Sequence, residues 1–171
     1  MIYTIGHSTR LIEEFIALLG EQAVDLVVDV RRFPGSRRHP QFGAEALTAA
    51  LAAVGVTRRH EEVLGGRRSP APDSPNGYWR RAQFRGYADH LATPEARAAV
   101  ERLVEEGAAH RLALLCAEAV PWRCHRQLVA DALTARGLEV WHILSRGRLE
   151  RHVLNPAARP GGDGVLVYPA P

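Results

Sequence analysis

Short apolar runs alternate with helical patterns along the chain. Residues 2–5, 25–30, 111–116 and 138–144 are apolar and rich in leucine or β-branched side chains, which predicts four buried strands. Between them, apolar positions at helical spacing predict helices over 11–19, 44–54, 86–91, 94–106 and 121–136, and residues 56–61 carry a weaker strand pattern. This alternation predicts a Rossmann-like α/β fold of three layers, with a mainly parallel sheet and helices on both faces.

The chain length of 171 residues corresponds to one domain. We predict a single α/β domain over residues 1–146, followed by a C-terminal tail over 147–171. Residues 63–85 contain many glycines, prolines and serines and predict a long arginine-rich loop inserted into the domain. Loops of this length are either functional lids or disordered segments.

Composition places the chain among ordinary globular proteins. Hydrophobic residues make up 46% and charged residues 24%, which argues against disorder, collagen and coiled coils. No apolar run approaches the roughly 18 residues of a membrane span, and the N-terminal residues lack the basic start and long apolar stretch of a signal peptide. We therefore expect a cytoplasmic protein with no membrane partner. The sequence carries no indication of oligomeric state.

All 22 basic side chains are arginines, and a GC-rich genome would account for the missing lysines. Their distribution is uneven, because residues 31–85 have a net charge of +7 and the rest of the chain has a net charge of −4. Such a basic segment favours a phosphate-bearing partner, either a small molecule or nucleic acid.

Aromatic residues interleave with these arginines, which suits nucleic acid because arginines contact phosphates and rings stack on bases. A solvated basic loop above a core of aromatic side chains is the simpler alternative. The residues are Arg37, Arg38, Arg58, Arg59, Arg67, Arg68, Arg80, Arg81 and Arg85, with Phe42, Tyr78, Trp79, Phe84 and Tyr87.

Polar residues with useful chemistry follow the predicted strands, at the sheet edge where parallel α/β proteins bind ligands. They are His7 and Ser8 after the first strand, Asp29 and Arg31 at the second, Cys116 and Glu118 at the third, and Cys124, His125 and Arg126 at the start of the next helix. We expect these side chains to form one site, since a purely structural protein has little reason for this pattern.

Four segments carry a family resemblance. They are Thr4-Ile-Gly-His-Ser, Asp29-Val-Arg followed by Pro34 and Ser36-Arg37, Gly86-Tyr-Ala-Asp, and Cys116-Ala-Glu ending in Cys124-His-Arg. Together they resemble the domain-of-unknown-function family 488 over residues 2–144. The resemblance implies a bacterial or archaeal α/β domain with a functional site and carries no established activity. The chain departs from the family pattern at Ala119, where many members have a basic residue.

The segment from Cys116 to Arg126 predicts a thiol-dependent site that binds an anion. A helix N-terminus attracts anions, and a thiol in its first turn beside a histidine and an arginine has a lowered pKa suited to nucleophilic attack. In this hypothesis Cys124 or Cys116 is the nucleophile, and Glu118 and His125 are the acid–base groups. The residues predicted to bind the anion are His7, Ser8, Asp29, Arg31, Arg37 and Arg126.

Structural roles are open for the same residues. Cysteine phosphatases and rhodaneses place an arginine six positions after the cysteine, whereas this chain has Trp122 there, which disfavours their mechanism. Both cysteines could be core thiols instead. Asp29 and Arg31 could form a structural ion pair, Ser8 could cap the next helix, and His7 could pack in the core.

A metal site is a further alternative, with Cys116, Cys124, His125 and His7 as ligands. The cysteines are eight positions apart, however, and structural zinc sites use a spacing of about two to four. We therefore predict no cofactor. The leading hypothesis is a thiol-dependent hydrolase or transferase that acts on a phosphate-bearing substrate. The alternatives are a non-catalytic nucleic-acid-binding module that uses the region from Arg31 to Arg85, and a metal-dependent enzyme.

Overall fold

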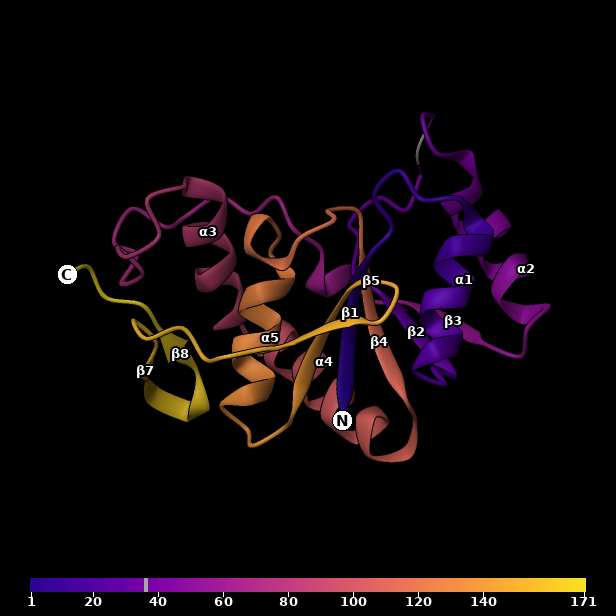
Figure 1. Cartoon of the computed structure of the whole chain (residues 1–171). Helices are drawn as coiled ribbons and strands as arrows, with labels where there is room; N and C mark the ends of the chain where they lie inside the picture. Colours follow the sequence, from indigo (N-terminus) through magenta and orange to yellow (C-terminus); the bar gives the residue numbers. More distant parts are fainter. Residues whose placement is uncertain (36) are drawn as a thin grey trace.

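The computed structural model describes residues 1–35 and 37–171. In this part of the chain, six strands form one sheet in the order β3-β2-β4-β1-β5-β6 (Figure 1). Neighbouring strands are parallel except for the antiparallel pair of β5 and β6, so the predicted α/β fold with a mainly parallel sheet is confirmed. The strands are β1 (Ile2–Gly6), β2 (Leu26–Asp29), β3 (Thr57–His60), β4 (Leu112–Cys116), β5 (Val140–Ser145) and β6 (Arg148–Arg151).

Helices cover both faces of the sheet (Figure 1). The helices are α1 (Ile12–Glu21), α2 (Ala44–Ala52), α3 (Ala82–Leu91), α4 (Pro94–Ala109) and α5 (Arg126–Thr134). Alternate strand residues point to opposite faces. Ile2 therefore packs in the core beneath α3, α4 and α5, whereas Tyr3 packs in the core beneath α1 and α2.

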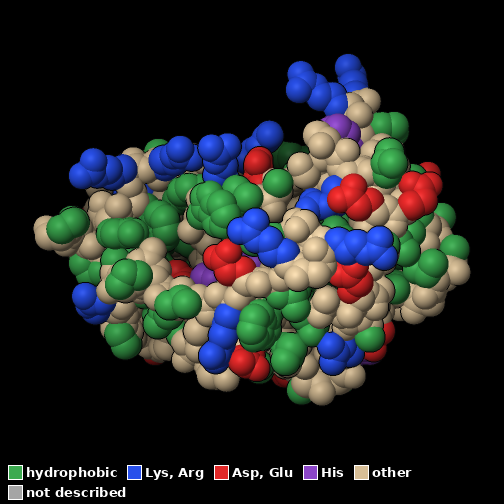
Figure 2. Space-filling model, viewed as in Figure 1, with side chains coloured by type: hydrophobic (Ala, Val, Ile, Leu, Met, Phe, Trp, Pro, Cys, Tyr) green, Lys and Arg blue, Asp and Glu red, His purple; other side chains and the backbone are tan. Residues whose placement is uncertain are grey.

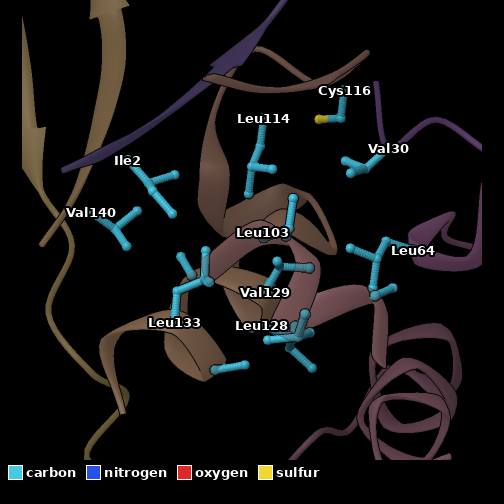
Figure 3. Close-up of a cluster of buried hydrophobic side chains, with 14 of the residues drawn as sticks. Ile2, Val30, Leu64, Leu103, Leu114, Cys116, Leu128, Val129, Leu133 and Val140 are labelled. Carbon is cyan, nitrogen blue, oxygen red and sulfur yellow. The ribbon is translucent and has the colours of Figure 1, made fainter. Parts of the chain in front are cut away.

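The core beneath α3, α4 and α5 extends to the carboxyl edge of the sheet. Figure 3 shows Ile2 and Val140 at one side of this cluster and Cys116 beside Val30 at another. Burying a Leu or Val side chain stabilises a fold by about 1.5–3 kcal/mol, and these strand residues are almost completely buried. The apolar core therefore fixes β4 firmly just before the residues at its carboxyl end.

The segment 147–171, predicted as a tail, is integrated into the structure. β6 extends the sheet, and β7 (Arg159–Pro160) pairs with β8 (Leu166–Val167). Tyr168 is buried in the core beneath α5. The side chains of β6 are exposed, so the segment lacks the apolar alternation from which a strand is recognised.

The largest differences from the predicted helix boundaries are at the starts of α3 and α5. α3 begins at Ala82, four residues before the predicted start. The predicted helix over 121–136 divides into a single 3₁₀ turn, Pro121–Arg123, and α5, so Cys124 lies between them in extended backbone rather than in the first turn of a helix. The pattern missed this break because proline is favoured in the first turn of a helix. Within the described residues, no helix is long and apolar enough to cross a membrane.

Candidate functional site

A cavity of about 450 Å³ opens at the carboxyl edge of the sheet, where β2 and β4 end. Its lining combines two thiols, four arginines and one carboxylate with an exposed aromatic ring. The lining residues are Arg31, Arg32, Phe33, Gly35, Gly66, Arg67, Gln83, Phe84, Cys116, Ala117, Glu118, Arg123, Cys124 and His125. Of the residues predicted from the sequence, the structure brings Arg31, Cys116, Glu118, Cys124 and His125 together here.

The two cysteines are in direct contact. Their Sγ atoms lie 2.7 Å apart, both thiols are free, and both residues are at most 3% exposed. Burial raises the pKa of the Cys116 thiol, and its hydrogen bond to Cys124 raises that pKa further. Burial also acts to raise the pKa of Cys124, but the hydrogen bond from Cys116 and the Arg126 guanidinium outweigh it and lower that pKa. The pair therefore favours a Cys116 thiol that donates to a Cys124 thiolate.

Arg126 lies behind the cysteines and is fully buried. Its Nη1 group donates to Cys116 Sγ at 2.6 Å, and its backbone N–H donates to Cys124 Sγ at 3.5 Å. The guanidinium also donates to the carbonyl oxygens of Glu118 and Ala119. Burial would lower the pKa of Arg126, but the nearby sulfurs raise it, so the side chain stays charged. Arg126 does not line the cavity, and it therefore stabilises a thiolate rather than forming the cavity wall.

A chain of hydrogen bonds connects Arg126 with the C-terminal segment. Arg126 Nε donates to Thr4 Oγ1 at 3.2 Å, and Thr4 Oγ1 lies 2.7 Å from His142 Nδ1. His142 Nε2 lies 3.0 Å from His152 Nδ1, and His152 Nε2 lies 2.8 Å from Asp131 Oδ1. A carboxylate can only accept, so His152 Nε2 carries a proton and donates to Asp131. Burial lowers the pKa of His142 to about 3.

His125 is oriented by its backbone contacts. Its Nε2 lies 3.2 Å from the carbonyl oxygen of Val30, which fixes the proton on Nε2. Nδ1 is then free to accept a proton and lies 3.6 Å from Cys124 Sγ. The ring contacts Tyr87 at a centroid distance of 4.8 Å, and burial lowers the pKa of His125. A Cβ on Gly66 would lie 2.8 Å from Nδ1, so the absence of a side chain there leaves room for the imidazole.

Asp29 is a fully buried carboxylate between two arginines. Arg31 donates from its backbone N–H, Nε and Nη2, and Arg58 on β3 donates from Nε and Nη2. Burial alone would raise the pKa of Asp29, but these hydrogen bonds and charges lower it. Asp29 therefore holds Arg31 at the cavity wall instead of contacting a ligand itself.

Besides Asp29 and Arg126, three more of the predicted anion-binding residues lie outside the cavity lining. His7 stacks on Phe42 at a centroid distance of 4.4 Å, and burial lowers its pKa to about 4. Ser8 does not cap α1, because Leu11 occupies that position, and the Ser8 backbone N–H donates to the Ala117 carbonyl. Arg37 is exposed and is not among the lining residues, and Ser36 of the same motif lies outside the described residues.

The predicted site residues did not include Arg32, Phe33, Arg67 or Arg123, all of which line the cavity. Arg67 was predicted only as one of the arginines suited to nucleic acid. Phe33 is 65% exposed, and the Arg32 guanidinium lies 5.5 Å from its ring centroid. Figure 2 shows arginine side chains along the upper edge of the view above α3, and others on a projecting loop across a dip in the surface. The signal in the sequence was the adjacency of Arg32 to Arg31 and of Arg123 to Cys124.

Other arginines of the basic segment are committed to ion pairs. Arg59 forms ion pairs with Glu61 and Glu106, each at 2.7 Å, and Arg58 forms an ion pair with Asp29. Among residues 1–35 and 37–171, no three His, Cys, Asp or Glu side chains are placed to hold a metal ion. The positive charge near the cavity therefore comes mainly from loop arginines.

The fold and this site define an α/β protein with paired thiols in an arginine-lined cavity at the carboxyl edge of its sheet. The chain belongs to the family described as Domain of unknown function DUF488, whose model matches residues 11–133. The resemblance predicted from the sequence motifs is thereby confirmed. A search of curated proteins finds no match, and a search of solved structures finds none either.

Proposed function

We propose that this protein is an enzyme that binds a phosphate-bearing substrate in the arginine-lined cavity and uses Cys124 as its nucleophile. One observation carries the proposal: Cys124 Sγ lies at the wall of a cavity that also presents Arg31, Arg32, Arg67 and Arg123. Arginine is well suited to phosphate because its planar guanidinium can donate two parallel hydrogen bonds.

The geometry around Cys124 supports nucleophilic attack. The Arg126 backbone N–H donates to Cys124 Sγ, and Cys116 Sγ lies 2.7 Å from it, which supports a Cys124 thiolate. His125 Nδ1 is the acceptor for the thiol proton, because Val30 holds the other ring nitrogen protonated. In the proposed reaction the thiolate attacks an electrophilic centre of the substrate while the arginines hold its phosphate. The leaving group takes a proton from His125 or from Glu118, both of which line the cavity.

Binding is tested by titrating the reduced protein with inorganic phosphate in a calorimeter. We expect Arg67→Gln and Arg123→Gln to weaken binding roughly tenfold or more, since a hydrogen bond to a charged group contributes about 1.5–3 kcal/mol. Arg97→Gln is the matched control, because Arg97 forms an exposed ion pair with Asp163 and does not line the cavity. Equal phosphate affinity in all three variants would contradict the proposed cavity.

Catalysis is tested on a panel of phosphate-bearing sugars, nucleotides and short oligonucleotides. Product formation should be lost in Cys124→Ser and reduced in Glu118→Gln. If Cys116→Ser, Cys124→Ser and Glu118→Gln all retain full activity on a substrate that the wild type converts, the proposed chemistry is wrong.

A second candidate is a non-catalytic nucleic-acid-binding module. It is favoured by the exposed ring of Phe33 beside Arg32 and by the exposed side chains of Arg67, Arg80 and Arg81. Such a surface combines phosphate contacts with a stacking platform for a base. It predicts oligonucleotide binding that weakens steeply with salt and is unchanged in Cys124→Ser.

A further inference from the structure

The two thiols differ in their surroundings, and this difference gives them different roles. Cys124 Sγ accepts a hydrogen bond from the Arg126 backbone N–H and lies 3.6 Å from His125 Nδ1, a base that can take its proton. Cys116 ends β4, and its Sγ lies 2.7 Å from Cys124 Sγ and 2.6 Å from Arg126 Nη1. The base beside Cys124 makes it the attacking sulfur, and Cys116 is the second thiol in contact with it.

Any group that becomes attached to Cys124 is within reach of a second sulfur. The Sγ atoms lie 2.7 Å apart, whereas the bond in a disulfide is about 2.0 Å long, so bond formation requires a movement of less than about 1 Å. Both cysteines line the same cavity, so a small molecule that enters can meet either sulfur. A mixed disulfide at Cys124 would thus be resolved by Cys116, which displaces the attached thiolate.

We infer that Cys124 and Cys116 carry out thiol–disulfide exchange with an anionic low-molecular-mass disulfide that binds in the arginine-lined cavity. This inference rests on the proposed cavity and nucleophile, and it adds a second reaction of the same site. It assigns Cys124 as the attacking residue and Cys116 as the resolving residue.

The exchange proceeds in two steps. The Cys124 thiolate attacks one sulfur of the disulfide RSSR, forms a Cys124–S–S–R bond and releases RS⁻. Cys116 then transfers its proton to the released thiolate or to His125 Nδ1 and attacks Cys124 Sγ, which breaks the bond to R and releases the second RS⁻. The thiolate–thiol pair of the protein loses two electrons and one proton. RSSR gains the two electrons and becomes two RS⁻ groups, which take up that proton and one from solvent to form two RSH molecules.

Charge determines which disulfides the cavity accepts. Four arginines line it and Glu118 is its one lining carboxylate, as far as the described residues extend. A disulfide that carries carboxylates is attracted to this wall, whereas one that carries ammonium groups is repelled. The difference should therefore be seen in the rate of exchange.

The experiment compares glutathione disulfide, which is anionic, with cystamine, which is cationic, as oxidants of the reduced protein. We expect glutathione disulfide to react roughly tenfold or more faster at low salt, with the difference shrinking as salt is added. Two thiols should be released for each protein chain, and the intact mass should fall by two hydrogen atoms. Cys116→Ser should accumulate a glutathione adduct on Cys124, and Cys124→Ser should react at a much lower rate.

If a variant fails to fold, the intact mass of the oxidised wild-type protein still tests the inference. A stable mixed disulfide in the wild type, or equal rates with both oxidants, would overturn the inference. The proposed function is tested separately from the exchange reaction. Phosphate binding, and its loss in Arg67→Gln, are measured on the reduced protein without any disulfide. Normal phosphate binding with no exchange would leave the enzyme proposal standing and refute the exchange reaction.

Discussion

Thr4 Oγ1 and His142 Nδ1 lie 2.7 Å apart on the neighbouring strands β1 and β5. The Thr4 hydroxyl also accepts from Arg126 Nε. A single hydroxyl therefore joins the guanidinium behind the cysteines to the two histidines and to Asp131.

Replacing Thr4 tests the importance of this connection. Thr4→Val keeps the shape of the side chain but leaves His142 Nδ1 without its hydroxyl partner and Arg126 Nε without an acceptor. We expect the free energy of unfolding to fall by about 1–3 kcal/mol, measured by urea denaturation. Thr48→Val is the control, because the Thr48 hydroxyl is exposed and donates to a helix carbonyl, and it should change stability by less than about 0.5 kcal/mol. Equal losses in the two variants would argue against a buried network.

The C-terminal segment should contribute to stability through Tyr168. Its hydroxyl donates to Asp131 Oδ2 at 2.8 Å, and its ring contacts Trp79 at a centroid distance of 5.3 Å. Tyr168→Phe should lower the free energy of unfolding by about 1–3 kcal/mol, since Asp131 loses a buried donor. Trp79 fluorescence during urea unfolding reports the transition. Tyr78→Phe, at an exposed ring, should be close to neutral, and a neutral Tyr168→Phe would mean that the segment is weakly attached.

Gly6 permits the close approach of two loops. A Cβ at this position would lie within bonding distance of the Glu118 carbonyl oxygen and 3.0 Å from Arg126 Nη1. Gly6→Ala must displace the backbone after Cys116, and we expect a loss of at least about 1–3 kcal/mol together with altered alkylation kinetics at Cys124. Gly20→Ala in α1 meets no atom within 4 Å and should be neutral or stabilising by up to about 1 kcal/mol. Similar stabilities for both variants would contradict this packing.

Acid should destabilise the fold through two buried imidazoles. Burial lowers the pKa of His7 to about 4 and that of His142 to about 3, against an ordinary value of 6.5. At pH values between 6.5 and these lowered pKa values, the two histidines bind protons in the unfolded chain but not in the folded chain. The free energy of unfolding should therefore decrease as the pH falls below about 6.5, by up to about 1.4 kcal/mol per pH unit for each histidine.

Urea denaturation between about pH 7 and pH 4.5 checks the predicted slope. His7→Gln should flatten it by up to one histidine's contribution, because the variant has no imidazole to protonate at that position. His110→Gln removes an exposed histidine and serves as the control. Parallel pH profiles for the wild type and His7→Gln would show that His7 is not the source of the acid sensitivity.

The buried strands were predictable because they carry continuous apolar runs between parallel neighbours. β6 was not predictable, because its side chains are all exposed and show no apolar alternation. Its position in the sheet depends on antiparallel pairing with β5. The break between Arg123 and Arg126 was also missed, because the proline that begins the 3₁₀ turn equally suits a helix start.

The site was partly predictable for a topological reason. Parallel strands end at one edge, so residues after β2 and β4 were expected together, and the structure places Arg31 beside both cysteines in one cavity. The role of Arg58 depends on the register of β2 and β3, which local sequence does not reveal. Arg67 approaches the cavity from a distant loop with a left-handed backbone conformation, for which the chain carries no local signal. The chemical roles of these residues stay predictions.

Arg126 carries its positive charge at 0% exposure, and none of the ion pairs among the described residues joins it to a carboxylate. Its nearby source of negative charge is sulfur, which supplies that charge only while it is reduced and deprotonated. Any reaction at Cys124 therefore changes the electrostatic free energy of the core as well as the chemistry of the cavity. Folding and the state of the thiols are thermodynamically linked, so the melting temperature of this protein should report the redox and ligation state of its site.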